Sequence, residues 1–67
     1  MAAATISDVT DLQLTAGGEV QVLRQQLPGH PGEVLLGVTE DGEAVMVSLS
    51  LAEAACLSER LAQLADA

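Results

Sequence analysis

Few residues in this chain could carry out catalysis. It contains one histidine, His30, and one cysteine, Cys56. Nucleophilic catalysis needs a serine or cysteine held beside a base. His30 stands in a Pro-Gly-His-Pro-Gly turn, whereas Cys56 falls on the polar side of a predicted helix, and no pattern brings the two together. We therefore predict that the chain has no catalytic residues and is not an enzyme.

Metal and cofactor sites are not indicated either. A structural metal site needs about four ligands from cysteine, histidine or carboxylate side chains, and one histidine with one cysteine falls short of that number. Glu40, Asp41 and Glu43 cluster at one turn but match no calcium-loop spacing. The glycines are spaced as turns rather than as a phosphate-binding loop. We expect no metal ion and no cofactor.

The charge of the chain restricts its partners. Ten acidic residues stand against Arg24 and Arg60, with no lysine, so the formal net charge is -8. Such a charge repels nucleic acid and anionic membrane surfaces, which bind basic patches. We expect no direct binding to nucleic acid and no association with membranes. The start of the chain lacks the basic and apolar regions of a signal peptide, and a single cysteine fits a reducing compartment, so we predict a cytoplasmic location.

The acidic residues also suggest a function. Glu33, Glu40, Asp41 and Glu43 fall at predicted hairpin tips and strand starts, where core formation does not explain them. One hypothesis is a small acidic protein-interaction module that binds a basic, nucleic-acid-binding protein surface. An inhibitor encoded by a phage or mobile element would act in this way. The alternative is a structural or assembly protein that self-associates through its second sheet face or its helix.

The second half of the chain has the clearest structural pattern. Asp41-Gly42 predicts a two-residue hairpin turn, since both positions require φ > 0. This turn places Glu40 opposite Glu43 and aligns three apolar pairs on one face of strands 33–39 and 43–49. Ser50, followed by Glu53 three residues later, forms a capping box that predicts a helix over about 51–65.

The first half predicts a second hairpin, with strands over about 9–15 and 19–27 and partly frayed residues over 1–8. A three-residue loop places Leu14 opposite Val20, Leu12 opposite Val22 and Arg24 opposite Thr10. The whole is then a single α+β domain, residues 1–67, in which a four-stranded antiparallel meander is followed by one C-terminal helix packed on one sheet face. The predicted core face carries Leu12, Leu14, Val20, Val22, Val34, Leu36, Val38, Val45, Val47 and Leu49.

The composition predicts a homodimer. No aromatic residue is present, so the core must consist of small aliphatic side chains, and a single core of this length seldom supplies enough stability without a further device. A lone cysteine forms no intramolecular disulfide, which leaves oligomerisation as the remaining common device; the alternative is a well-idealised monomer. The candidate interfaces are the alanine edge of the helix, with Ala55 and Ala62, and the second sheet face, with Leu23, Leu35 and Met46.

Overall fold

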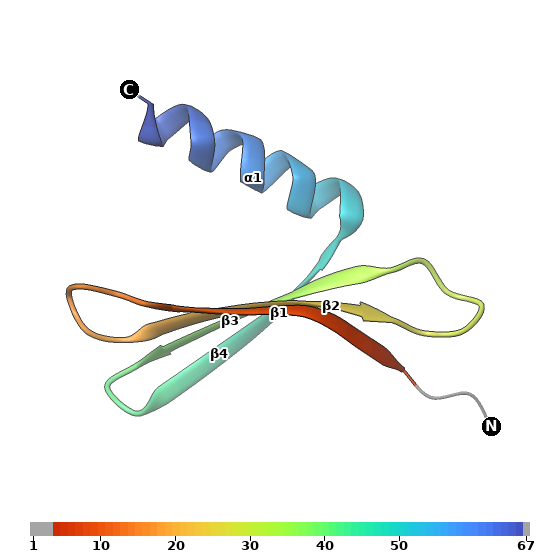
Figure 1. Ribbon diagram of the computed structural model, residues 1–67, viewed down its shortest axis with the longest axis horizontal. Helices are drawn as coiled ribbons and strands as arrows, with labels where there is room; N and C mark the ends of the chain where they lie inside the picture. Colours follow the sequence, from red (N-terminus) through yellow and green to blue (C-terminus); the bar gives the residue numbers. More distant parts are fainter. Residues whose placement is uncertain (1–3, 67) are drawn as a thin grey trace.

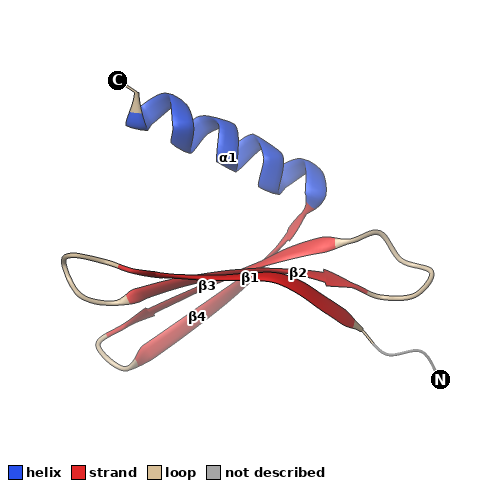
Figure 2. Cartoon of the chain, in the orientation of Figure 1, coloured by secondary structure: helices blue, strands red, loops and turns tan. Residues whose placement is uncertain are grey.

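A four-stranded sheet with a helix above one face makes up the protein (Figures 1 and 2). The computed structural model describes residues 4–66. The strands β1 (Thr5–Gln13), β2 (Glu19–Gln26), β3 (Glu33–Glu40) and β4 (Glu43–Ser50) pair in sequence order, each antiparallel to the next, and α1 (Leu51–Ala65) follows β4 directly. The predicted α+β meander with a C-terminal helix is confirmed.

The β3–β4 hairpin has the predicted register. Asp41 (φ 51°) and Gly42 (φ 80°) both occupy the left-handed region, as a type I′ turn requires. Glu40 pairs with Glu43, and the pairing continues along both strands to Glu33 opposite Ser50. The alternation of side chains therefore places the predicted apolar pairs on one face.

The register of the β1–β2 hairpin differs from the prediction by two residues. Leu12, not Leu14, lies opposite Val20, and Arg24 lies opposite Ser7 rather than Thr10. Leu14 belongs to the connecting loop, where its N–H donates to the Gly18 carbonyl over 3.0 Å. Gly18 (φ 96°) passes so close to β3 that a Cβ would lie 2.7 Å from the Thr39 carbonyl oxygen. This close approach favours the longer loop, and a shift of two residues leaves Leu12 on the predicted face.

Strand β1 also begins earlier than predicted. Pairing starts at Thr5, inside the segment that was expected to be frayed; residues 1–3 lie outside the described part of the chain. The register shifts between Ser7 and Thr10, where Asp8 adopts a φ of 56°. A bulge adds a residue to one strand and interrupts the alternation of side chains. The apolar pattern of β1 is therefore visible only beyond the bulge.

A capping box fixes the start of α1. The Glu53 N–H donates to Ser50 Oγ over 3.1 Å, and the Ser50 N–H donates to Glu53 Oε1 over 2.9 Å. The backbone and side-chain hydrogen bonds of Ser50 hold the pKa of Glu53 below its ordinary value of 4.5. Because Ser50 is also the last residue of β4, the same two bonds set the direction in which the helix leaves the sheet.

The helix does not close the core. It lies against β3 and β4 and rises away from the sheet along its length (Figure 1). Among residues 4–66 no hydrophobic side chain is buried. The sequence pattern predicted which face is apolar, but the chain leaves that face largely open.

We predict that Ser50→Ala destabilises the protein by about 1 kcal/mol, the usual loss for removal of a serine N-cap. The free energy of unfolding in urea, compared with that of the wild type, measures the effect. A change near zero would mean that the capping box does not hold the start of α1.

Acid should weaken the same cap. A carboxyl group whose pKa is lowered on folding stabilises the protein above its unfolded pKa, and this contribution disappears as the pH falls through the folded value. The stability difference between wild type and Glu53→Gln should therefore be present at neutral pH and shrink below pH 4.5. Urea titrations at several pH values test this, and a difference that does not vary with pH would contradict the assignment.

Candidate functional site

An apolar wedge opens between the sheet and α1. It encloses about 380 Å³ and is lined almost entirely by aliphatic side chains. The sheet contributes residues from β2, β3 and β4, and the helix contributes residues from its first three turns. The lining residues are Val22, Val34, Leu36, Leu49, Ala54, Leu57, Ser58 and Leu61.

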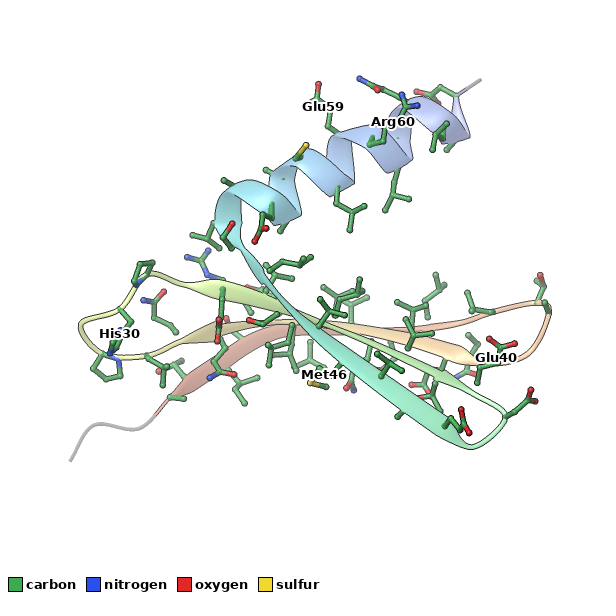
Figure 3. All side chains as sticks on the ribbon, turned by 180° about the vertical axis from the view of Figure 1, so that it is seen from behind. His30, Glu40, Met46, Glu59 and Arg60 are labelled. Carbon is green, nitrogen blue, oxygen red and sulfur yellow. The ribbon has the colours of Figure 1, made fainter. Side chains whose placement is uncertain are left out.

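Local sequence explains the position of the wedge. Alternation along β3 and β4 directs Leu36 and Leu49 toward the helix side of the sheet. The spacing of Leu57 and Leu61 places both on one side of α1. Since the capping box ties the first turn to the end of β4, the two apolar surfaces meet near that point and diverge beyond it. Figure 3 shows Glu59 and Arg60 on the opposite side of the helix, pointing away from the sheet.

The apolar surface extends well beyond the wedge. Toward the β3–β4 turn, Val45 is 64% exposed and Val47 is 47% exposed, and Leu12 on β1 is 58% exposed. Leu61 and Leu64 on α1 are exposed to a similar degree. We call this continuous surface the apolar face; it comprises Leu12, Val20, Val22, Val34, Leu36, Val38, Val45, Val47 and Leu49 of the sheet with Leu57, Leu61 and Leu64 of the helix.

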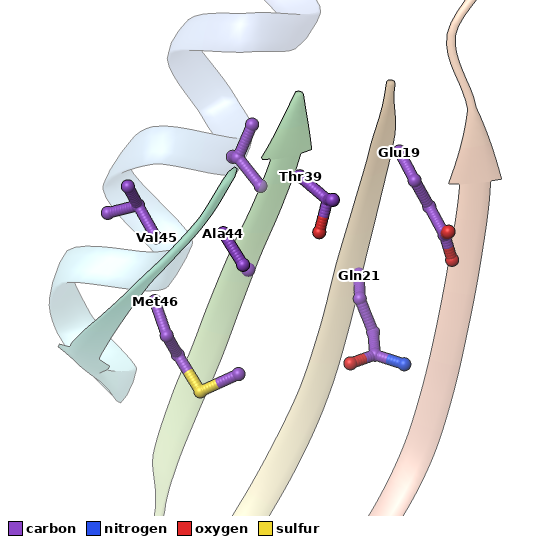
Figure 4. A pocket seen from close by; sticks show the side chains of 8 residues that line it. Glu19, Gln21, Thr39, Ala44, Val45 and Met46 are labelled. Atoms are coloured by element: carbon purple, nitrogen blue, oxygen red, sulfur yellow. The ribbon is translucent and has the colours of Figure 1, made fainter. Parts of the chain in front are cut away.

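The second sheet face is smaller and more polar. Leu23 and Leu35 are half-buried there, while Met46 is exposed and lies on the side away from α1 (Figure 3). A hollow of about 340 Å³ is lined by Gly37 together with Met46 and Gln21, whose side chains are labelled in Figure 4. Gln21 Nε2 donates to Asp11 Oδ1 over 2.9 Å on the same face. The predicted interface residues of this face are therefore interspersed with polar groups.

The acidic candidates separate into two places. Three of them lie together at the β3–β4 tip, beside Val38: Glu40, Asp41 and Glu43. Glu40 and Glu43 are direct cross-strand partners. Glu33 stands at the other end of β3, about 23 Å away at the usual rise per residue. It lies on the opposite sheet face, where it accepts a hydrogen bond from Ser48 Oγ over 2.7 Å.

The two candidate catalytic residues of the sequence, His30 and Cys56, do not come together in the structure. The backbone N–H of His30 closes a turn by donating to the Leu27 carbonyl oxygen over 3.1 Å. Cys56 is an exposed free thiol on α1. Residues 4–66 contain no group of three histidine, cysteine or carboxylate side chains placed to hold a metal ion. Ala55 and Ala62 are exposed on the helix. Within the described residues, no helix is long and apolar enough to span a membrane.

The sequence pattern predicted the apolar face as the interior of the fold, whereas the structure leaves much of it exposed. Its residues were identified correctly except for Leu14, which lies in the β1–β2 loop. The absence of aromatic side chains, which predicted a small core, is the sequence signal that fits this exposure. Comparison with protein-family models, curated proteins and solved structures gives no match, so these surfaces are interpreted from their own chemistry.

Proposed function

We propose that this chain is a small, non-enzymatic protein-interaction module that binds through its apolar face. One observation carries the proposal: the sheet and the helix both direct aliphatic side chains toward the same space, and none of these side chains is fully buried, with Leu57 and Leu61 exposed. Large exposed apolar surfaces on soluble proteins mark sites of interaction.

The chemistry of the apolar face favours a protein over a small molecule. Small-molecule sites combine an apolar lining with a few precisely placed polar groups. Among the residues that line the wedge, Ser58 supplies the only polar side chain, and the cavity is open to solvent. Anionic lipid surfaces are disfavoured by the net charge of -8. A protein surface of complementary shape remains the best occupant.

Site-specific photo-crosslinking tests this proposal. A photoreactive phenylalanine analogue at position 61 should form a covalent adduct with a protein in cells that naturally make the chain, because Leu61 points into the apolar face. The matched control is the same analogue at Gln63, two residues away on the polar side of α1, where Arg60 donates to its amide oxygen. Equal adduct formation at both positions, or none at 61, would contradict the proposal.

A second candidate function is docking onto a basic protein surface through the acidic tip. The observation in its favour is the Glu40–Glu43 cross-strand pair, since like charges directly opposite each other destabilise a sheet. A basic partner would relieve that repulsion. Such a partner could be a nucleic-acid-binding protein, in which case the chain acts as an inhibitor of the kind that phages and mobile elements encode.

Charge removal tests the second candidate. Glu40→Gln/Glu43→Gln should slow association with a basic partner and increase protomer stability, because it removes the repulsion and leaves the Asp41-Gly42 turn unchanged. Glu59→Gln/Asp66→Asn is the matched control, which removes the same charge from α1 and its C-terminal cap. Association rates that are equal for the two variants and independent of salt would exclude an electrostatic contact at the tip.

A further inference from the structure

We infer that the occupant of the apolar face is a second copy of this chain, giving a twofold-symmetric homodimer. The inference rests on the proposed function, in that it assumes the apolar face binds protein, and it adds the identity of that protein. It also selects the interface, which is the apolar face, including Leu57, Leu61 and Leu64 of α1 (the leucine edge). The alanine edge of α1 and the second sheet face are not part of it.

The surface area of the protomer supports a dimer. The chain exposes 5201 Å², whereas a compact monomer of 6.8 kDa is expected to expose about 4,000 Å². The difference, about 1,200 Å² per protomer, corresponds to about 2,400 Å² buried by two copies, within the range of about 2,000–5,000 Å² that obligate homodimers bury. One interface in this range would therefore reduce the exposed area of each protomer to about that of a compact monomer of the same mass.

The dimensions of the protomer lead to the same conclusion. Its Cα radius of gyration is 13.6 Å, compared with about 11 Å for a compact chain of 67 residues. A compact body of twice that length is expected to have a radius of about 14 Å. The protomer is thus nearly as wide as a compact dimer would be, as expected for one half of a shared core.

The apolar face contains both halves of a self-complementary contact. Within the described residues α1 contacts β3 and β4 but not β1 or β2, and of these last two strands only Val22 lines the wedge, so Leu12 and Val20 lie outside it. The same helix presents Leu61 and Leu64, both more than half exposed. In a twofold interface the same patch serves on each side, so the leucine edge of each copy can cover Leu12 and Val20 of the other.

The charges are arranged so that they do not oppose this contact. Charged residues of the apolar side of the sheet lie only at its two ends, with Glu40 and Glu43 at the β3–β4 tip and Arg24 near the opposite end, beside Val34. These charged residues therefore lie at the rim of the contact, and the aliphatic residues between them carry no charge. Glu33 is on the second sheet face, and Glu59 points away from the sheet, so both remain in solvent.

Solution mass with paired variants tests the dimer. Light scattering of the purified wild type at micromolar concentration should give about 14 kDa, twice the 6.8 kDa protomer. Leu61→Glu and Val47→Asp, which place a charge on the apolar face, should reduce the dimer fraction at least tenfold. Gln63→Glu and Met46→Asp make similar changes on the opposite sides of α1 and β4, and both should remain dimeric.

The results separate the dimer from the proposed function. A folded wild type of about 7 kDa, or dissociation by Met46→Asp instead of Val47→Asp, overturns the inference. Should the apolar-face variants lose their circular dichroism as well as their dimer, the position-61 photo-crosslink in otherwise wild-type protein decides. An adduct between two copies supports the dimer, an adduct only with another protein overturns it while the proposed function stands, and no adduct overturns both.

Discussion

The structure depends on one constraint: the chain has an apolar face that it cannot bury by itself. Its apolar side chains include no aromatic residue, and a single helix contacts only part of a four-stranded sheet. Hydrophobic stabilisation is roughly proportional to the apolar area removed from water, and the protomer removes it incompletely, since its described hydrophobic side chains are half-buried or exposed and none is fully buried. Folding and association are therefore expected to be coupled, as in obligate dimers.

Local interactions define the shape of the protomer in spite of that open face. The Asp41-Gly42 turn aligns β3 with β4, and the reciprocal Ser50–Glu53 hydrogen bonds orient α1 as it leaves the sheet. Neither device requires a closed core. They set the direction of α1 relative to β4, and the wedge lies between the helix and the sheet.

How much the sequence predicts depends on the range of the interaction concerned. The β3–β4 register, the capping box and the meander follow from residues near one another in the chain. The β1–β2 register does not, because Leu12 and Leu14 fit the alternation equally well and the close approach of Gly18 to Thr39 is a tertiary contact. The same limit applies to the candidate sites. An alternating pattern shows which face is apolar, but only the arrangement of α1 shows that much of it stays uncovered.

Contacts between copies can be observed directly by nuclear magnetic resonance on a mixture of isotope-labelled and unlabelled chains. Filtered nuclear Overhauser spectra of such a mixture contain only signals that cross from one copy to the other. We predict intermolecular signals from the methyl groups of Val45, Val47 and Leu61 on the apolar face. Signals confined to Leu23, Leu35 and Met46, or the absence of intermolecular signals in a folded sample, would contradict this prediction.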